Sequence, residues 1–343
     1  MIYLDSAAQS PVLPCAREAY LSAPFGNPSS EHAVGHAARA ALEQAREKIA
    51  NLMGCEPEEI YFTSTATEAA ATVIHSLESS WYRVFPSLYE HHAITENILS
   101  TAAYVEMVEA RMYGNNETGE ISYLSSHQNQ KSLSVCDATA SVGHVPFSFR
   151  EIVGNGYAIC DGIKFGSVPG AAIVVAKKGA PLTPLIRGGG QERGKRAGTE
   201  NVPAICAMAT ALEWQTEHMA ENTQKIAAMR QILFQSLSRV ENHKWNTPFE
   251  KPCLPHILNV SFDGVDGKAL ALILSNEGVM VSTGAACSNG LNEPSHVLMA
   301  MFHDEQRARS AIRISLSHEN TPDECVVAAE KIKAAVAYLR SLA

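Results

Sequence analysis

The chain has 343 residues, of which 46% are hydrophobic and 18% are charged, and its formal net charge is −9. This length provides one large core or two domains, which excludes a small module that depends on disulfide staples. The negative charge and the absence of a long Lys/Arg cluster argue against direct nucleic-acid binding, because a basic face is needed to neutralise phosphates.

Helical and strand patterns alternate over the first two thirds of the chain. The first helix is expected at 31–53, with a cap at Ser29 or Ser30 and a stop at Gly54. The other expected helices are 68–77 and 202–239, the second with a break near Glu217, and the expected strands are 59–62, 105–112, 133–136, 157–160 and 171–175. This alternation predicts an α/β fold with a parallel sheet covered by helices on both faces.

Three polar residues lie at the ends of these predicted strands: Thr63, Asp137 and Lys164. Because ligands of such sheets bind beyond the carboxyl ends of the strands, we expect the three residues to share a site. After about Met219 the pattern changes to strands at 257–262, 279–282 and 312–316, with helices at 268–275, after Pro294 and from Pro322. We therefore predict a large domain at 13–218 and a smaller α+β domain formed by 1–12 and 219–343.

Neither a signal peptide nor a membrane span is expected. The first ten residues carry no basic-then-apolar run, and the most apolar stretch, 171–176, is too short to cross a bilayer. The eight cysteines form no C-x-x-C pair, which favours reduced thiols and a cytoplasmic protein. Cys287 lies among small residues at 282–290, so its thiol is either an accessible group that swings to a substrate or an incidental one.

Several other residues each allow a functional and a structural interpretation. Lys164, in Asp-Gly-Ile-Lys-Phe-Gly, is either a Schiff-base lysine or a surface lysine. Asp137 either holds a pyridinium proton or caps a helix. His91 either stacks on a flat cofactor and relays a proton or starts a helix. Arg313, inside an apolar strand, pairs either with an internal carboxylate or with a substrate carboxylate.

Two segments could bind phosphate. Residues 63–68 run from a strand into a helix, so their hydroxyl and amide groups form either an anion cup or ordinary helix caps. Residues 188–201 are rich in glycine and basic residues, and they form either a loop that approaches a phosphate or a flexible surface loop.

Taken together in chain order, these motifs resemble the cysteine desulfurases of the NifS/IscS kind, which are class V, fold-type I enzymes dependent on pyridoxal 5'-phosphate (PLP). The matching segments are 3–5, 26–30, 63–68, 90–91, 115–117, 137–139, Lys164, 188–201, 259–262, 284–288, 294–298 and Arg313. The resemblance implies a large domain with a mainly parallel, seven-stranded-like sheet. The segment between His91 and Asn115 is shorter than in such enzymes, which would trim this sheet.

The resemblance also implies a role for each matching residue. Lys164 would bind PLP covalently and move protons, His91 would stack on the ring, and Asp137 would bind the ring nitrogen. Asn116 would contact the ring hydroxyl or the substrate. Cys287 would take the sulfur of L-cysteine as a persulfide. The implied phosphate ligands are Ala66, Thr67 and, from the other subunit of a homodimer, Thr199, while Asn27 and Arg313 would bind the substrate carboxylate.

The chain departs from this pattern around the implied phosphate site. Asp161 and Ile163 stand where the family has Ser and His, Ala140 stands for Gln, and Thr65 stands for Gly. The expected function is PLP-dependent cysteine desulfuration that passes sulfur to an acceptor protein, such as an iron–sulfur scaffold or a tRNA-thiolation protein. The alternatives are a selenocysteine lyase-like enzyme and a catalytically weakened paralogue that acts as a binding or regulatory partner.

Overall fold

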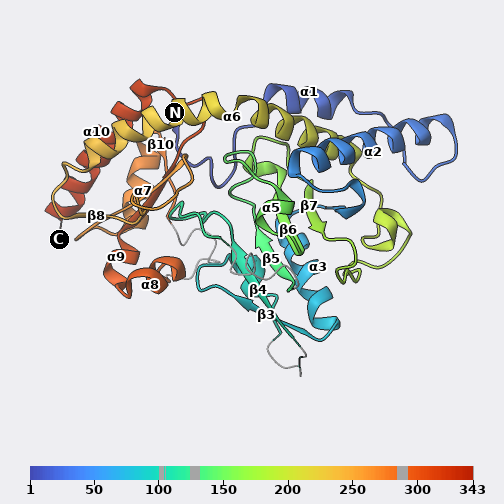
Figure 1. The fold of residues 1–343 in the computed structure, drawn as a ribbon. Helices are drawn as coiled ribbons and strands as arrows, with labels where there is room; N and C mark the ends of the chain where they lie inside the picture. Colours follow the sequence, from blue (N-terminus) through green and yellow to red (C-terminus); the bar gives the residue numbers. More distant parts are fainter. Residues whose placement is uncertain (100–103, 105, 124–131, 284–292, 343) are drawn as a thin grey trace. The chain divides into compact units, whose positions relative to one another are not determined.

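The structure, a computed structural model, describes residues 1–99, 104, 106–123, 132–283 and 293–342 (Figure 1). The chain forms two compact units. The larger unit contains residues 11–113 and 122–217, and the smaller contains residues 1–10, 114–121 and 218–343. The predicted domain boundaries differ from these units mainly at 114–121, a short segment that belongs to the smaller unit although it lies far from the rest of that unit in sequence.

The larger unit is built on a mixed sheet of six strands in the order β2-β7-β6-β5-β4-β3. The strands are β2 (Ile60–Thr63), β3 (Tyr82–Pro86), β4 (Glu106–Met112), β5 (Ser134–Asp137), β6 (Gly156–Asp161) and β7 (Ala172–Ala176). β7 is antiparallel to both of its neighbours, whereas β6, β5, β4 and β3 pair in parallel. The α/β class and the mainly parallel sheet are confirmed, with six strands in the described part of the chain rather than seven.

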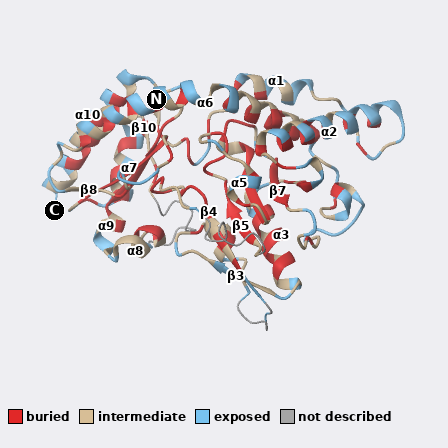
Figure 2. Cartoon of the chain, viewed as in Figure 1, coloured by how far each residue is buried: buried red, intermediate tan, exposed pale blue. Residues whose placement is uncertain are grey.

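The central strands form the core of this unit. Every residue of β5, β6 and β7 is buried, as the red strands of Figure 2 show. Helix α3 (Ala66–Ser79) covers one face of the sheet, with Val73, Ile74 and Leu77 in a buried cluster with residues of β4, β5 and β6. Near-continuous apolar strands of this kind are typical of a sheet that is covered rather than exposed to solvent.

The helices differ from the predictions at three points. The first helix is α1 (Pro14–Ser22), which begins with a proline and was not predicted from the sequence. Helix α2 (Ala33–Met53) is capped by His32, whose Nδ1 accepts from the Gly35 amide at 3.2 Å, and not by a serine. Helix α6 (Val202–Leu237) continues through Glu217 without the predicted break. The predicted stop at Gly54 is confirmed, because that residue adopts φ 67°.

The remaining helical elements in the described part of the larger unit are short. They are α4 (His92–Thr95), α5 (Phe149–Ile152) and the 3-10 turns η1 (Pro57–Glu59), η3 (Gly162–Lys164) and η4 (Gln191–Gly194). The η3 turn follows β6 directly and contains Lys164, and α4 follows β3 after a short loop that contains His91.

The smaller unit has an antiparallel sheet of three strands in the order β11-β9-β8, with a separate parallel pair, β1 and β10. The strands are β1 (Ile2–Tyr3), β8 (His243–Trp245), β9 (Ile257–Phe262), β10 (Val279–Met280) and β11 (Ala311–Ser315), and the helices are α7 (Gly267–Asn276), α8 (His296–Phe302), α9 (Glu305–Arg309) and α10 (Pro322–Ser341). Leu258, Val260 and Phe262 of β9 pack in one core with Leu270 of α7 and Ile332 of α10. Because these strands and helices share one core, the smaller unit has the α+β character that the sequence predicts.

Candidate active site

The sheet register brings the predicted residues of the larger unit to one edge. Thr63 of β2 and Asp161 of β6 both pair with Ala172, the first residue of β7. Asp137 of β5 pairs with Ile159 of β6 on one side and with Met112 of β4 on the other. Because the carboxyl ends of β2, β4, β5 and β6 meet here, the loops that follow them carry their side chains to a common place.

Lys164 ends the η3 turn that follows β6. The turn is fixed at its start, where Asp161 Oδ1 accepts from the Ile163 amide at 3.2 Å and the Gly162 amide donates to Ala171 O at 3.1 Å. It is fixed at its end by His144, whose Nε2 lies 2.8 Å from Lys164 O. A side chain at Gly162 would come within 2.9 Å of Ser167 Cβ and 3.2 Å of Ala171 O, so the close approach requires glycine.

Asp137 presents a buried carboxyl group, 6% exposed, at the end of β5. Its Oδ1 accepts from the Thr139 amide at 2.9 Å, and its carbonyl accepts from the Tyr113 amide at 2.8 Å. The hydroxyl of Thr139 is buried and finds no hydrogen-bond partner within the described ranges. Buried polar atoms in proteins are nearly always satisfied, so a carboxylate beside an unsatisfied hydroxyl is the kind of arrangement that a polar ligand completes.

His91 caps helix α4. Its Nδ1 accepts from the Ala93 amide at 3.0 Å, which places the proton of the neutral ring on Nε2. Both interpretations of this residue, the start of a helix and a site for proton transfer, are therefore compatible with the geometry.

Glu90, next to His91, is fully buried and was not singled out from the sequence. Its Oε1 accepts from the Ser87 hydroxyl at 2.6 Å and from the Met112 amide at 2.7 Å, and Met112 is the residue that pairs with Asp137. Burial and the charge of Asp137 raise the pKa of Glu90 to about 8, although the hydrogen bonds from Ser87 and Met112 and the charge of Arg111 lower it. A Glu-His pair four residues after the end of β3 at Pro86 is the signal that could have revealed this residue.

Glu90→Gln is expected to change how stability depends on pH. Between the unfolded pKa of 4.5 and the folded pKa of about 8, the folded protein keeps a proton that the unfolded chain has lost, so its unfolding free energy falls as pH rises. The glutamine variant lacks this loss, on the order of 3 kcal/mol between about pH 5 and pH 8. Denaturant unfolding at the two pH values measures the difference.

The exposed Glu58 provides a matched control for this measurement, since Glu58→Gln removes a carboxylate that lies outside the core. The control should follow the unmodified protein at both pH values. An equal pH dependence in Glu90→Gln and the unmodified protein would show that Glu90 is already ionised in the folded state.

The amino terminus of α3 is capped by the chain itself. The Thr65 side chain accepts from the Glu68 amide at 3.2 Å, and Glu68 Oε2 accepts from the Ser64 amide at 2.9 Å and from the Ser64 hydroxyl. The Ala66 amide donates to Asp161 Oδ2 at 2.9 Å. The capping interpretation of residues 63–68 is therefore confirmed, while phosphate binding by Ala66 and the exposed Thr67 stays a prediction.

The cations of the glycine-rich segment 188–201 are held by contacts within the larger unit. Arg196 Nε lies 2.8 Å from Glu68 Oε1, and Lys195 Nζ donates to Leu182 O at 2.8 Å. The buried Glu192 pairs with Arg46 at 2.7 Å and accepts from the Phe62 amide at 2.8 Å. The segment is thus anchored rather than a flexible surface loop.

Two further predicted residues of the larger unit are exposed. They are Asn27, whose Oδ1 accepts from the Ser29 amide at 2.9 Å, and Thr199, which lies in the glycine-rich segment. Their roles in binding substrate and phosphate stay predictions.

Arg313, on β11 of the smaller unit, is buried and pairs with an internal carboxylate. Its Nη2 donates to Asp5 Oδ1 at 2.8 Å, and its Nη1 donates to the main-chain carbonyl of Asn116 at 2.8 Å. Its Nε is buried with no hydrogen-bond partner among the described residues, so one donor of the guanidinium remains unsatisfied. The main chain of Asn116 therefore serves to hold Arg313, and the role predicted for its side chain stays a prediction.

Glu117, beside Asn116, supports the same region. It is buried, its Oε2 accepts from the Ser295 hydroxyl at 2.6 Å, and its main-chain carbonyl accepts from Asn259 Nδ2 at 3.1 Å. Burial raises the pKa of Glu117 to about 7, against the lowering effects of Ser295 and Arg313.

Cys287 lies outside the described residues. The other seven cysteines are described, and burial raises the thiol pKa of each: Cys15, Cys55, Cys136, Cys160, Cys206, Cys253 and Cys325. A thiol is nucleophilic only as the thiolate, so none of these seven has the surroundings of a reactive cysteine. This result favours a structural role for these seven cysteines.

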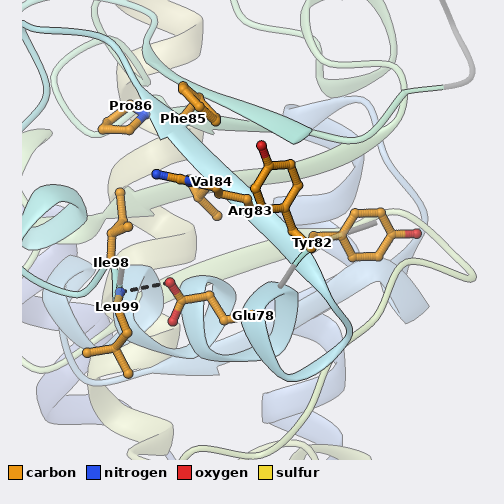
Figure 3. A pocket seen from close by; sticks show the side chains of 9 residues that line it. Glu78, Tyr82, Arg83, Val84, Phe85, Pro86, Ile98 and Leu99 are labelled. Atoms are coloured by element: carbon orange, nitrogen blue, oxygen red, sulfur yellow. Dashed lines mark hydrogen bonds between the residues drawn. The ribbon is translucent and has the colours of Figure 1, made fainter. Parts of the chain in front are cut away.

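A pocket of about 160 Å³ lies along β3. Figure 3 shows its lining side chains, including Tyr82 and Arg83 of β3 and Glu78 of α3, whose Oε1 accepts from the Leu99 amide at 2.8 Å. No predicted site residue lines it. Within the described ranges, no group of three or more His, Cys, Asp or Glu side chains is placed to hold a metal ion, and no helix has the length and apolar character needed to cross a membrane.

Comparisons with known proteins agree with this geometry. The aminotransferase class-V family matches residues 2–123 and 87–326. A cysteine desulfurase of Enterobacter agglomerans is 33% identical, with 99% of this chain and 94% of the relative aligned. The cysteine desulfurase NifS of Azotobacter vinelandii is 30% identical, with 99% and 94% aligned.

A solved structure of a NifS-like protein gives a TM-score of 0.89 at 31% identity, covering 98% of this chain and 99% of that one. The alignment with the Enterobacter agglomerans protein spans 378 positions, 35 more than the chain has residues, so the relative has segments that this chain lacks. The chain belongs to the aminotransferase class-V family, and within it to the cysteine desulfurases of the NifS and IscS kind.

Proposed function

We propose that this protein is a PLP-dependent cysteine desulfurase, which converts L-cysteine to L-alanine and leaves the sulfur on Cys287 as a persulfide. The observation that carries the proposal is the placement of Lys164, Asp137 and His91 at one edge of the sheet, in a chain that matches cysteine desulfurases over nearly its whole length. The chemistry of these three side chains is that of a PLP site: an amine, a buried carboxylate and an imidazole.

The ring end of PLP fits these residues. A carboxylate at Asp137 would hold the proton of the ring nitrogen, and the hydroxyl of Thr139, which has no partner in the described part of the chain, offers a polar contact beside it. Lys164 provides the amine for covalent attachment, on a turn whose backbone is fixed at both ends. At the phosphate end the fit is poorer, because the Ala66 amide is already bonded to Asp161.

When bound, PLP supplies an electron sink next to the α-carbon of the substrate. The side chains supply proton transfer: the amine of Lys164 takes the α-proton, and His91 offers a proton on Nε2, the nitrogen that its capping bond leaves protonated. Arg313 is held by Asp5 and Asn116, and its Nε has no hydrogen-bond partner among the described residues, which is consistent with binding the substrate carboxylate, a role we propose it shares with Asn27.

The sulfur step uses Cys287 as the nucleophile. Its thiolate attacks the substrate sulfur, an S–S bond forms and the Cβ–S bond breaks. The electron pair of that bond stays on Cβ, which takes a proton and becomes the methyl group of alanine. The raised pKa of the seven other cysteines supports this assignment, since a persulfide requires an accessible thiolate.

The assembly and the setting of the enzyme are part of the proposal. We propose a cytoplasmic homodimer in which Thr199 of each subunit contacts the phosphate bound by the other. The sulfur would pass from Cys287 to an acceptor protein, such as an iron–sulfur scaffold or a tRNA-thiolation protein.

A second candidate function is a catalytically weakened paralogue that acts as a binding or regulatory partner. The observation that favours it is the carboxylate of Asp161 at the place where a phosphate would bind. It predicts a protein that keeps the fold and the site residues but retains little PLP.

The test is to supply the purified protein with PLP and L-cysteine and to measure alanine and protein-bound persulfide together. The proposal expects equal amounts of the two in a single turnover without a reductant. Alanine production only from selenocysteine would indicate a selenocysteine lyase, and the absence of any product would favour the weakened paralogue.

A further inference from the structure

The carboxylate of Asp161 lies at the amino terminus of α3, a helix of 14 residues. Its Oδ2 accepts from the Ala66 amide at 2.9 Å and its Oδ1 accepts from the Ile163 amide at 3.2 Å, so one carboxyl group joins the first turn of α3 to the turn that carries Lys164. The residue is 5% exposed. The Asp161 carboxyl group therefore links α3 to η3 through two hydrogen bonds and is the anion at this helix terminus.

A second carboxylate occupies the same helix terminus. The Glu68 carboxylate accepts hydrogen bonds from the Ser64 amide and from Arg196 Nε, and the Thr65 hydroxyl accepts one from the Glu68 amide. Amide groups at a helix amino terminus attract anions. Here the amides of Ala66 and Glu68 already donate to the side chains of Asp161 and Thr65. An incoming phosphate would have to displace Asp161 from Ala66 or lie close to its charge, and either is unfavourable.

The surroundings of Asp161 act on its carboxyl group in both directions. Burial and the charge of Asp137 raise its pKa, and the hydrogen bonds from the Ala66 and Ile163 amides and the charge of Lys164 lower it. Lys164 is the amine that the proposed function commits to covalent attachment, so it is not available as a permanent partner. The aldehyde and ring of a ligand would not depend on the α3 terminus, because the proposed function assigns their contacts to Lys164, Asp137 and His91.

We propose that Asp161 is a specificity-determining residue that stands in for the ligand phosphate, so that the site accepts the unphosphorylated aldehyde pyridoxal nearly as well as PLP. This inference rests on the proposed function, since it requires a pyridoxal-type aldehyde bound to Lys164. It goes beyond that function by naming the residue that sets which form of the cofactor is held.

The experiment compares the dissociation constants of PLP and of pyridoxal for the full-length protein, measured by equilibrium dialysis. Borohydride reduction and peptide mass spectrometry then show whether Lys164 is the residue modified. The variant is Asp161→Asn, which keeps an oxygen for the Ala66 amide and removes the charge. Asp161→Ser is a second variant, and Glu58→Gln is the control for loss of a surface carboxylate.

The expected result is that the unmodified protein binds the two aldehydes with constants within about tenfold of each other. Asp161→Asn and Asp161→Ser should bind PLP about 10- to 100-fold more tightly and pyridoxal with little change. A strong preference of the unmodified protein for PLP, unchanged in both variants, would overturn the inference and leave the proposed function intact. If neither aldehyde modifies Lys164 in any of the proteins, the proposed function fails, and the inference fails with it.

Discussion

Lys164→Ala is expected to abolish covalent attachment of the cofactor and to lower the rate of alanine formation by on the order of 1000-fold or more. The reason is that the Lys164 amine is proposed both to bind the aldehyde covalently and to transfer the α-proton. Its place at the end of a turn held by Asp161 and His144 fixes the main chain from which this amine extends. The measurement is the visible absorbance of the PLP-supplemented and desalted protein, followed by borohydride reduction and mass spectrometry.

Lys178→Ala is the matched control, because Lys178 is an exposed lysine of the same unit on the loop after β7. It should retain the absorbance band and the activity of the unmodified protein. An unchanged band in Lys164→Ala, with the label on another lysine, would mean that the attachment site has been assigned to the wrong residue.

Cys287→Ala is expected to keep cofactor and substrate binding while reducing persulfide formation to the background level. The variant removes only the proposed nucleophile, so the absorbance change on adding L-cysteine should persist. Because burial raises the pKa of the seven other thiols, to about 12 for Cys55 and Cys325, we expect none of them to replace it at neutral pH. Labelling of the protein persulfide after one turnover measures the effect.

Cys206→Ala, at a partly exposed cysteine of α6, is the control for this variant and should form persulfide normally. Normal persulfide formation in Cys287→Ala would move the sulfur-accepting role to another cysteine. Loss of the absorbance change in that variant would instead place Cys287 in substrate binding.

Much of the fold follows from local pattern. The apolar runs predicted the strands β5, β6 and β7 to within one or two residues, and the strand at 257–262 was predicted with its observed bounds. Strand β3 was missed because Tyr82–Pro86 mixes an arginine and a proline with its apolar residues. Helix α1 was missed because its start at Pro14 has no capping side chain and it buries little of its surface.

The site could be predicted in part. Residues that directly follow strands, such as Lys164 and Asp137, were found because strand ends mark the ligand edge of a parallel sheet. The bond between Asp161 and Ala66 could not be predicted, because it joins residues 95 positions apart through the register of β2, β7 and β6. The pairing of Arg313 with Asp5 was likewise left open, since the sequence shows that a buried arginine needs a partner but not which one.

The position of β3 at the end of the sheet has a consequence for solubility. Within the described residues it pairs only with β4, so one row of its main-chain amides and carbonyls faces outward, where another protein's strand could add to it and begin aggregation. Two features of the strand oppose such addition. Pro86 has no amide hydrogen to donate, and Arg83 places a charge over the rings of Phe85 and Tyr104. Arg83 and Pro86, which made β3 difficult to predict from the sequence, thus also protect the sheet edge from the strands of other chains.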